Sequence, residues 1–232
     1  MIKNSDISKV IAESLRLEES NNLNEALIAQ QKTFNLPTEF QSAATKKAHD
    51  GLYQGYLEAF NRISAELDTV DRSDVKSNGS NYRSLKQDET YNMNGVYLHE
   101  LYFANISDLT SNISMDTLSY MRLSRDFGDF DKWQSDFIAC CLASRCGWAI
   151  TYFNIFTQTY MNTFIDLHSQ SVPVGCIPII VMDVWQHAYY RDYLSDVKTY
   201  TYAMMKELNW GIIEDRIKRA EKVAFALKGT ST

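Results

Sequence analysis

The stretch CIPIIVMDVWQHAYYRDY, from Cys176 to Tyr193, joins an apolar run to a segment with helical spacing. The run is rich in β-branched residues, so it predicts a short buried strand that ends at Asp183. Asp183 and His187 are four residues apart, and if the chain enters a helix there, both side chains project to the same side. Burying a carboxylate is costly unless a positive group meets it. Two interpretations are open at this point: the pair binds a metal ion, or Asp183 caps the helix that starts near Trp185.

The sequence on either side of this stretch predicts a small sheet flanked by helices. Two runs dense in aromatic and β-branched residues, GWAITYFNIF and TYMNTFIDL, have only Thr157 and Gln158 between them, which indicates a β-hairpin. With the run that ends at Asp183, they predict a three-stranded antiparallel sheet. Helical sequence is expected over about residues 118–123, 130–144, 185–194 and 197–227.

The N-terminal half is predicted to be entirely helical. A polar stretch over residues 69–92 favours turns and predicts a mobile loop between two helices. The second of these helices is expected over about residues 94–106. The first is expected over about residues 42–67, with a buried stripe formed by Tyr53, Tyr56, Leu57 and Phe60.

These elements predict an α+β fold with two domains and an extension. Residues 1–36 are expected to form a helical extension, because apolar residues recur there near helical spacing. Residues 37–125 are expected to form an N-terminal helical hairpin domain. Residues 126–232 are expected to form a C-terminal domain with the three-stranded antiparallel sheet and its flanking helices.

Composition excludes several classes of partner. The chain has 232 residues, of which 45% are apolar, so it can bury a sizeable core. Its net charge is −6 without a stripe of Lys and Arg, and nucleic acid is therefore not an expected partner. No stretch approaches the roughly 20 apolar residues of a membrane span, and the N-terminus lacks the apolar block of a signal peptide. A cytoplasmic protein without a membrane partner is expected.

The cysteines show no spacing typical of a metal site or a disulfide framework. Three of the four fall in segments predicted to be buried, and no Cys-x-x-Cys pair occurs. Reduced thiols in the core are the favoured interpretation over disulfides or zinc ligands. The four residues are Cys140, Cys141, Cys146 and Cys176.

The histidines are the other candidates for metal binding. A single histidine on an amphipathic helix is more often a hydrogen-bonded core or surface residue than a ligand. Imidazole is nonetheless the commonest metal ligand in proteins, and carboxylate is its usual partner for iron and manganese. The chain has only four, namely His49, His99, His168 and His187.

The residues DVWQHAYY, from Asp183 to Tyr190, resemble the signature Asp-Val-Trp-Glu-His-Ala-Tyr-Tyr of the iron/manganese superoxide dismutase family. Seven of these eight positions match. The segments FGDFDKW, CGWA and LNW are similar to further motifs of this family, and so are KKAHDGLYQGYLEAFN and NGVYLHELYF in the N-terminal half. The resemblance covers about residues 37–217.

The resemblance implies one iron or manganese ion per subunit, with four protein ligands. Carried over residue by residue, these ligands are His49, His99, Asp183 and His187. His168 lies where the family has a side chain that hydrogen-bonds the solvent molecule bound to the metal. Many family members supply a glutamine for this contact, either there or four residues before the second ligand, where this chain has Gly95 and therefore leaves space.

The resemblance further implies conversion of superoxide to dioxygen and hydrogen peroxide, with the metal alternating between M(III) and M(II). Tyr56 is the candidate for the family's gateway tyrosine. Trp148, Trp185 and Tyr102 are candidates for an aromatic wall that keeps the site dry. Each of these aromatic residues would also serve as ordinary core, and for Tyr102 the two roles are equally compatible with the sequence.

The chain departs from the family pattern at several positions. Gln186 replaces a glutamate that reaches the metal-binding histidine of a neighbouring subunit, which weakens the expected dimer contact. Tyr53 replaces a histidine that pairs across the interface with the tyrosine equivalent to Tyr190. His49 and Tyr56 are seven positions apart instead of eight, and Val197 replaces an arginine, which removes a candidate for guiding an anionic substrate.

Two other function classes remain possible alternatives from the sequence. The first is a structural or interaction protein that kept the fold with vestigial activity and docks through residues 1–36. The second, a carboxylate-bridged di-iron oxidase, needs Glu-x-x-His pairs on two helices, and the chain has none. The favoured function is a superoxide dismutase that acts on superoxide as a homodimer, or as a larger assembly formed through residues 1–36.

Overall fold

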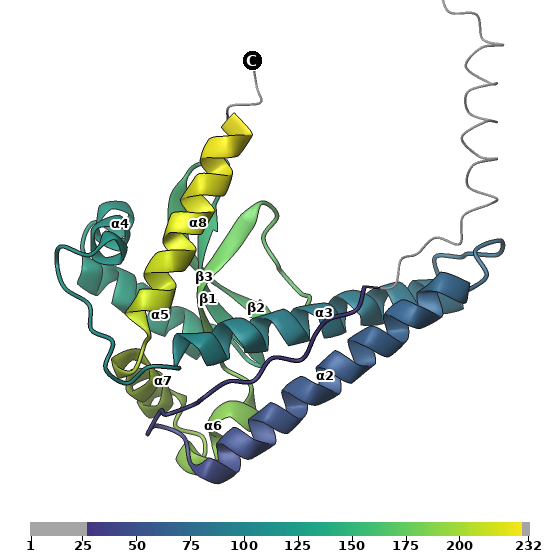
Figure 1. Cartoon of the computed structure of the whole chain (residues 1–232), viewed down its shortest axis with the longest axis horizontal. Coiled ribbons are helices and arrows are strands. Elements are labelled where there is room, and N and C mark those ends of the chain that lie inside the picture. The colour runs from purple at the N-terminus through teal and green to yellow at the C-terminus, as the bar shows by residue number, and fades with distance from the viewer. Residues whose placement is uncertain (1–26, 229–232) are drawn as a thin grey trace, which may run out of the picture.

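The structure, a computed structural model, describes residues 27–228 of the chain. Within these residues the order of elements is helical, then β, then helical again (Figure 1). The helices before the sheet are α2 (Ala43–Thr69), α3 (Asn81–Asn105), α4 (Leu118–Phe127) and α5 (Phe130–Ala143). The remaining elements are β1 (Gly147–Asn154), β2 (Thr159–Asp166), β3 (Cys176–Asp183), α6 (Gln186–Tyr193), α7 (Val197–Lys206) and α8 (Trp210–Lys228).

The two long helices α2 and α3 lie side by side as an antiparallel hairpin whose far end extends away from the rest of the molecule (Figure 1). A serine caps the N-terminus of each: Ser42 accepts a hydrogen bond from the backbone N–H of Thr45, and Ser80 accepts one from Arg83. The antiparallel arrangement brings the first turns of α2 next to the last turns of α3. We refer to this end of the hairpin as its base and to the end at residues 70–80 as its tip.

The sheet has the strand order β2-β1-β3, and both pairs are antiparallel. The central strand β1 is buried along seven of its eight residues, which explains its almost unbroken apolar and aromatic sequence. Helix α5 packs against β1 and β2, whereas α3 and α8 contact β3. One hydrophobic cluster continues from the base of the hairpin into the sheet. The end of β3 therefore lies beside the base of the hairpin, with α6 directly after it.

The α+β fold class, the three strands and the hairpin of helices are confirmed. The strand predicted to end at Asp183 ends there, and helix α2 begins one residue after the predicted Ser42. Along the predicted stripe, Tyr53, Leu57 and Phe60 are buried, and Tyr56 is partly exposed.

The predicted helix over residues 1–36 is wrong in the part that the structure describes. Residues 1–26 lie outside the described residues, and residues 27–36 form no helix. Instead they run along α2, where the backbone N–H groups of Leu27 and Ala29 donate hydrogen bonds to the side chains of Ser64 and Asn61. These side chains take the donors that helix formation would have used. The domain boundaries remain a prediction.

Two predictions about element boundaries are also wrong. Helix α3 begins at Asn81, not near Asn94, so the loop before it is much shorter than the predicted 69–92. Its first turns are polar because they lie at the exposed tip of the hairpin, which removes the apolar period that marks a helix. The predicted helix 197–227 is interrupted between α7 and α8, where the Asn209 side chain accepts a hydrogen bond from the backbone N–H of Ile212.

Two further expectations concern the state of the cysteines and the absence of a membrane span. All four cysteines are free thiols, but only Cys141 is buried, so fewer of them lie in the core than expected. Between residues 27 and 228, no helix combines the length and the apolar character that crossing a membrane requires.

Candidate metal centre

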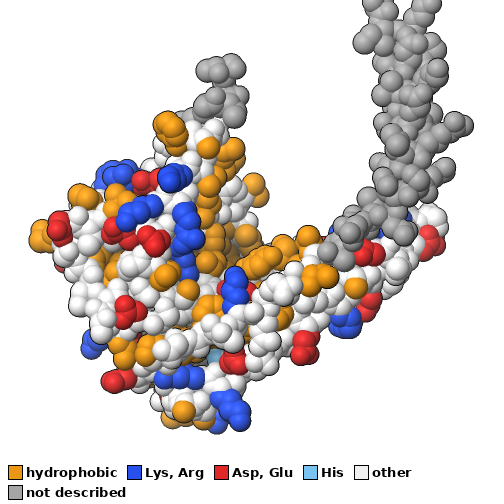
Figure 2. Space-filling model, in the orientation of Figure 1, with side chains coloured by type: hydrophobic (Ala, Val, Ile, Leu, Met, Phe, Trp, Pro, Cys, Tyr) orange, Lys and Arg blue, Asp and Glu red, His pale blue; other side chains and the backbone are white. Residues whose placement is uncertain are grey.

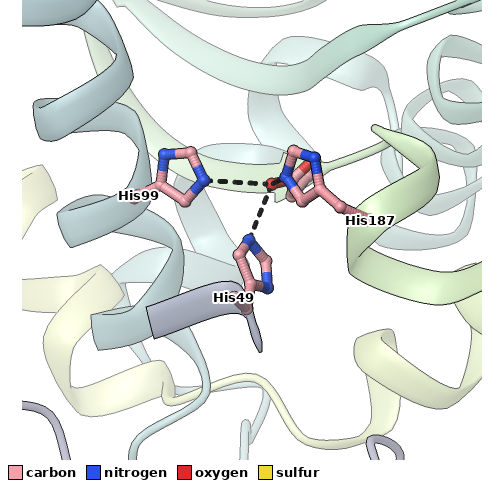
Figure 3. Close-up of side chains that lie close together, drawn as sticks. His49, His99 and His187 are labelled. Carbon is pink, nitrogen blue, oxygen red and sulfur yellow. Dashed lines mark hydrogen bonds and ion pairs between the residues drawn. The ribbon is translucent and has the colours of Figure 1, made fainter. Parts of the chain in front are cut away.

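Four side chains from four elements meet where the base of the hairpin contacts the sheet. His49 comes from α2, His99 from α3, Asp183 from the end of β3 and His187 from α6, and one potential ligand atom from each lies within 4.8 Å of all the others. Figure 3 shows the three imidazole rings turned toward one carboxylate oxygen. That atom, Asp183 Oδ2, lies 3.0 Å from Nε2 of His49, 3.1 Å from Nε2 of His187 and 3.7 Å from Nε2 of His99. Within the described residues this is the one cluster of His, Cys, Asp and Glu side chains suited to a metal ion.

The hydrogen bonds of His99 determine which ring nitrogen faces the cluster. Its Nδ1 donates to the backbone carbonyl oxygen of Gly95 at 2.6 Å, so the proton of the neutral ring is on Nδ1. Burial lowers the pKa of His99 to about 3, and it also lowers the pKa of His49. At neutral pH, Nε2 of His99 therefore presents a lone pair to the cluster, and this buried atom has no hydrogen-bond partner within the described residues.

Asp183 places a negative charge at the centre of the cluster, and among the described residues no Lys or Arg forms an ion pair with it. The carboxyl group has no exposed surface. Burial alone would raise the pKa of Asp183, but the neighbouring His187 and the hydrogen bonds from His187 and His49 outweigh it and hold the pKa below its usual range. Its Oδ1 accepts a hydrogen bond from the backbone N–H of Trp185 at 2.8 Å. Its Oδ2 lies 3.7 Å from the Nε2 lone pair of His99, and a cation between these two acceptors would give both of them a partner.

The donor set fits an iron or manganese ion. Three imidazole nitrogens and one carboxylate oxygen are the ligand types these ions prefer, and no thiolate is near the cluster. The cluster is also sequestered, because His49 and His99 have no exposed surface. On the face shown in Figure 2, histidine is visible only as one small spot. The metal-binding interpretation of Asp183 and His187 thus has a specific structural basis, and Asp183 Oδ1 also accepts a hydrogen bond from the backbone N–H of Trp185, the residue before α6.

Comparison with known proteins gives consistent results along most of the chain. Residues 117–216 match the family model described as iron/manganese superoxide dismutases, C-terminal domain. A protein of Aquifex aeolicus named superoxide dismutase [Fe] is 36% identical over 179 residues, which cover 76% of this chain and 83% of that protein. The chain belongs to the iron/manganese superoxide dismutase family. Superoxide dismutase [Mn] 1 of Halobacterium salinarum is 29% identical over 172 residues, which cover 74% of this chain and 84% of that relative.

The superoxide dismutase resemblance assigned His168 to the surroundings of the metal, and in the structure its ring lies beside the ligand cluster. Its ring centroid lies 6.1 Å from that of His99, and the side chain has no exposed surface. Nε1 of Trp148 donates a hydrogen bond to Nδ1 of His168 at 3.0 Å. Burial lowers the pKa of His168 to about 4, so the ring is neutral at pH 7 and its proton is on Nε2. This buried Nε2 has no hydrogen-bond partner among the described residues.

Tyr56 lies beside the site, despite the spacing that differs from the superoxide dismutase pattern. Its ring centroid is 4.7 Å from that of His168 and 5.3 Å from that of His99. Helix α2 is regular from end to end, and seven residues at about 100° each complete almost two turns, so Tyr56 lies on the same face as His49. The shorter spacing therefore does not turn Tyr56 away from the site.

The space at Gly95 is taken by Tyr56 itself. A Cβ atom at Gly95 would lie 2.9 Å from Cγ and 2.9 Å from Cδ1 of the Tyr56 ring. The resemblance suggested that Gly95 leaves space, and the structure shows that this space is filled by the tyrosine. Gly95 therefore fixes how closely Tyr56 approaches α3.

Trp148, Trp185 and Tyr102 surround the cluster as expected for an aromatic wall. The Trp148 ring lies 5.0 Å from that of His99, the Trp185 ring 5.9 Å from that of His187, and the Tyr102 ring 5.3 Å from that of His49. Tyr102 and Trp148 have no exposed surface, and Trp185 is partly exposed. The Tyr102 hydroxyl has a further contact that sequence reasoning missed.

A buried chain of hydrogen bonds supports Asp183 from behind. Tyr200 donates to the backbone carbonyl oxygen of Asp183 at 3.0 Å, and its hydroxyl lies 2.8 Å from that of Tyr102. Gln41 Nε2 in turn donates to the Tyr102 hydroxyl at 3.1 Å and to the carbonyl oxygen of Ala188 at 2.7 Å. Sequence analysis gave Gln41 and Tyr200 no role, because neither residue belongs to a motif that indicates a partner.

The three residues predicted at a dimer interface differ in exposure. Gln186 and Tyr190 are exposed on α6. Tyr53 has no exposed surface: its hydroxyl donates to Glu100 Oε1 at 3.1 Å and accepts from the backbone N–H of Lys32 at 3.0 Å. Residues 27–36 cover Tyr53, so it does not lie on the surface of the protomer as an interface residue would. The assignment of Tyr53 to a dimer interface remains a prediction, which its burial within the single chain does not favour.

Proposed function

We propose that the protein is a superoxide dismutase that binds one iron or manganese ion per subunit through His49, His99, Asp183 and His187. The observation that carries this proposal is the lone pair of His99 Nε2 facing the Asp183 carboxylate, with both side chains completely buried. Family membership supports the same function, because the relatives bear the names superoxide dismutase [Fe] and superoxide dismutase [Mn]. Relatives with either metal support a site that can take both.

When bound, the ion supplies one-electron redox chemistry, alternating between M(III) and M(II) while superoxide is converted to dioxygen and hydrogen peroxide. The protein's residues bind, orient and protect this ion. The Asp183 carboxylate balances part of its charge, and the hydrogen bond from Trp185 N–H to Oδ1 orients the carboxylate. The His99 to Gly95 hydrogen bond fixes the imidazole in the tautomer whose Nε2 can bind a metal.

His168 and Tyr56 provide protons next to the ion. His168 holds a proton at Nε2, where it can hydrogen-bond a solvent molecule in the site and so tune the reduction potential. Burial and the nearby Tyr91 raise the pKa of Tyr56 above its ordinary value, so its hydroxyl remains protonated at physiological pH. A protonated hydroxyl beside the site can donate a hydrogen bond to an anionic oxygen species, such as superoxide.

The proposal includes a homodimer formed through α6. Gln186 and Tyr190 are exposed there, next to the partly exposed His187. Gln186 can reach the metal-binding histidine of a second subunit only as a neutral acceptor, which gives a weaker contact than a carboxylate. Analytical ultracentrifugation should show a dimer that dissociates at micromolar concentration, and a strict monomer at all concentrations would contradict this part of the proposal.

The experiment that tests the function is a dismutation assay on protein reconstituted separately with iron and with manganese. At least one form should remove superoxide at a rate that scales with its metal content, and Asp183→Ala protein taken through the same reconstitution should be inactive. Metal incorporation without dismutation in either form would reject the proposed function. It would favour the alternative of a superoxide-dismutase-like fold kept for a structural or interaction role.

A further inference from the structure

His168 belongs to a loop, yet its side chain is as completely buried as a residue of the core. It lies between β2 and β3, directly after Leu167, which has a positive φ of 56°. A loop side chain needs outside contacts to keep one orientation. Trp148 supplies one of them through its hydrogen bond to Nδ1 of His168. A single hydrogen bond to one ring nitrogen fixes one direction of the ring. The orientation of the ring plane then depends on the side chains that pack against it.

Two tyrosines pack closest against this imidazole, beside Trp185, whose ring lies 5.2 Å away at an interplanar angle of 30°. The Tyr56 ring lies 4.7 Å from the His168 ring at an interplanar angle of 80°, and the Tyr91 ring lies 4.7 Å away at 68°. Both contacts are edge-to-face, the arrangement favoured by aromatic quadrupoles. The two tyrosine rings are themselves 6.3 Å apart, so they form adjoining walls around His168. Tyr56 was expected at this site, whereas the resemblance to known dismutases gave Tyr91 no role.

Helix α3 couples this arrangement to a metal ligand. It carries Tyr91, Asn94 and His99 within little more than two turns, and Asn94 Nδ2 donates a hydrogen bond to the backbone carbonyl oxygen of His168 at 2.7 Å. Both the backbone and the ring of His168 are thus positioned by the helix that holds His99. The position of His168 therefore depends on contacts with α3 as well as on the conformation of its own loop.

We propose that Tyr91 is a positioning residue that clamps the His168 ring, so that its Nε2–H points to one place in the metal site. This inference rests on the proposed function, because the direction of that N–H matters only where an acceptor is bound next to the ion. Tyr91 acts through the face and edge of its ring, since that is the part in contact with His168. A phenylalanine should therefore replace it, and an alanine should not.

The test compares Tyr91→Ala, Tyr91→Phe and a control variant, Tyr97→Ala, in the metal-loaded protein. Tyr97 is on the same helix, but 45% of its surface is exposed. In Tyr91→Ala the dissociation constant of azide, read from the absorption of the metal site, should rise about tenfold, as for lost partners of metal ligands. The midpoint reduction potential should shift as well. Tyr91→Phe should restore both properties to within about twofold, and Tyr97→Ala should leave them as in the unmodified protein.

A second measurement separates failure of this inference from failure of the proposed function. The indole N–H of Trp148, observed by ¹H–¹⁵N NMR in protein freed of paramagnetic metal, reports its hydrogen bond to His168 without any redox chemistry. Tyr91→Ala should move this signal and speed its exchange with solvent, whereas Tyr91→Phe should not. If Tyr91→Ala does not fold, Tyr91→Leu serves in its place, because a partly exposed leucine is compatible with a helix.

If Tyr91→Ala changes neither the azide affinity, nor the reduction potential, nor the Trp148 signal, Tyr91 does not position His168. This holds even if the protein proves to be an active dismutase. Equal losses in Tyr91→Phe and Tyr91→Ala would also overturn the inference, because they would assign the effect to the hydroxyl group. Inactive protein in which Tyr91→Ala still disturbs the Trp148 signal would reject the proposed function and leave the positioning role of Tyr91 intact.

Discussion

The two ends of the α2–α3 hairpin are built from the same kind of helix but bury different groups (Figure 1). At the tip, a small apolar cluster forms from Ile63, Leu67 and Leu85. At the base, His49 and His99 have no exposed surface, and each has a ring nitrogen without a hydrogen-bond partner within the described residues. Burial at the tip stabilises the fold, whereas burial at the base leaves Nε2 of His99 without a partner, a cost that a bound cation would remove.

This difference separates stability from function along a single pair of helices. Side chains at the tip can be changed without touching the ligand cluster, and the ligand side chains at the base can be changed without touching the apolar cluster at the tip. Matched variants at the two ends should therefore affect different measurements.

The largest effect is expected from Asp183→Ala at the base. Removing the carboxylate that faces all three histidines should lower metal affinity by about 100-fold or more, because loss of a mere hydrogen-bonding partner of a ligand already costs about 10–100-fold. Metal analysis after dialysis measures this, with Asp74→Ala at the exposed tip as the control. A full complement of iron or manganese in Asp183→Ala protein would show that the Asp183 carboxylate is not a metal ligand.

At the tip, Leu67→Ala should cost stability and leave the metal in place. Leu67 is completely buried, so the cavity should lower the free energy of unfolding by about 2–5 kcal/mol. Urea denaturation measures the change, and Leu52→Ala on the exposed face of the same helix should cost about 0.5 kcal/mol or less. Loss of metal from folded Leu67→Ala protein would show that the two ends are coupled.

Gly95→Ala should damage the base through Tyr56. The added Cβ would lie 2.9 Å from the tyrosine ring, so the ring has to move, at a cost of about 1–3 kcal/mol. Metal content should persist while dismutation falls by about tenfold or more, since misplacing a group at the site by about 1 Å can cost up to about 100-fold. Gly55→Ala on α2 is the matched control, because nothing lies within 4 Å of its new Cβ. It should stabilise the helix by up to about 1 kcal/mol. Full activity of Gly95→Ala would mean that the position of Tyr56 is unimportant.

Lowering the pH should destabilise the metal-free protein through its buried histidines. The pKa values of His99 and His168 in the folded protein are lowered by burial to about 3 and about 4, against 6.5 when unfolded. Between pH 6.5 and pH 4 the unfolded state thus binds more protons, so stability falls as the pH falls, by up to about 1.4 kcal/mol per pH unit for each group. Urea denaturation at pH 7.5, 6 and 5 checks the slope, and a constant unfolding free energy would contradict the buried neutral state of these rings.

The smallest effect is expected from Arg62→Ala near the tip. Arg62 forms an exposed ion pair with Glu66 one turn later, with 64% and 47% of the side chains exposed. Such pairs contribute about 0.3–0.5 kcal/mol, and the unfolding free energy should change by no more than this amount. A loss above about 1 kcal/mol would show that the tip depends on its charges as well as on its apolar cluster.

The same division explains which parts of the fold followed from sequence. The strands and the base of the hairpin were predicted, because their apolar runs have clear periods and their ends carry the ligand motifs. The start of α3 was missed, because a helix with solvent on most sides needs no apolar period. Residues 27–36 were misassigned for a related reason: hydrogen bonds to Ser64, Asn61 and Tyr53 hold their backbone, and these partners lie 21 to 37 positions away.

The candidate site shows the same limit. The four potential ligands were found from a family resemblance and prove to converge. The roles of Gly95 and Tyr91 depend on which side chain fills a space between α2, α3 and the loop after β2, and a list of residues does not contain that information. Gln41 and Tyr200 were missed because their partners are a tyrosine hydroxyl and backbone carbonyl groups, which leave no mark on the sequence.

The most direct test of the central claim is an anomalous difference map from crystals of the metal-loaded protein, measured on both sides of the iron or manganese absorption edge. The account predicts one peak per chain, bounded by Nε2 of His49, His99 and His187 and by Oδ2 of Asp183. A peak elsewhere, or no peak in protein whose metal content is close to one ion per chain, would contradict it.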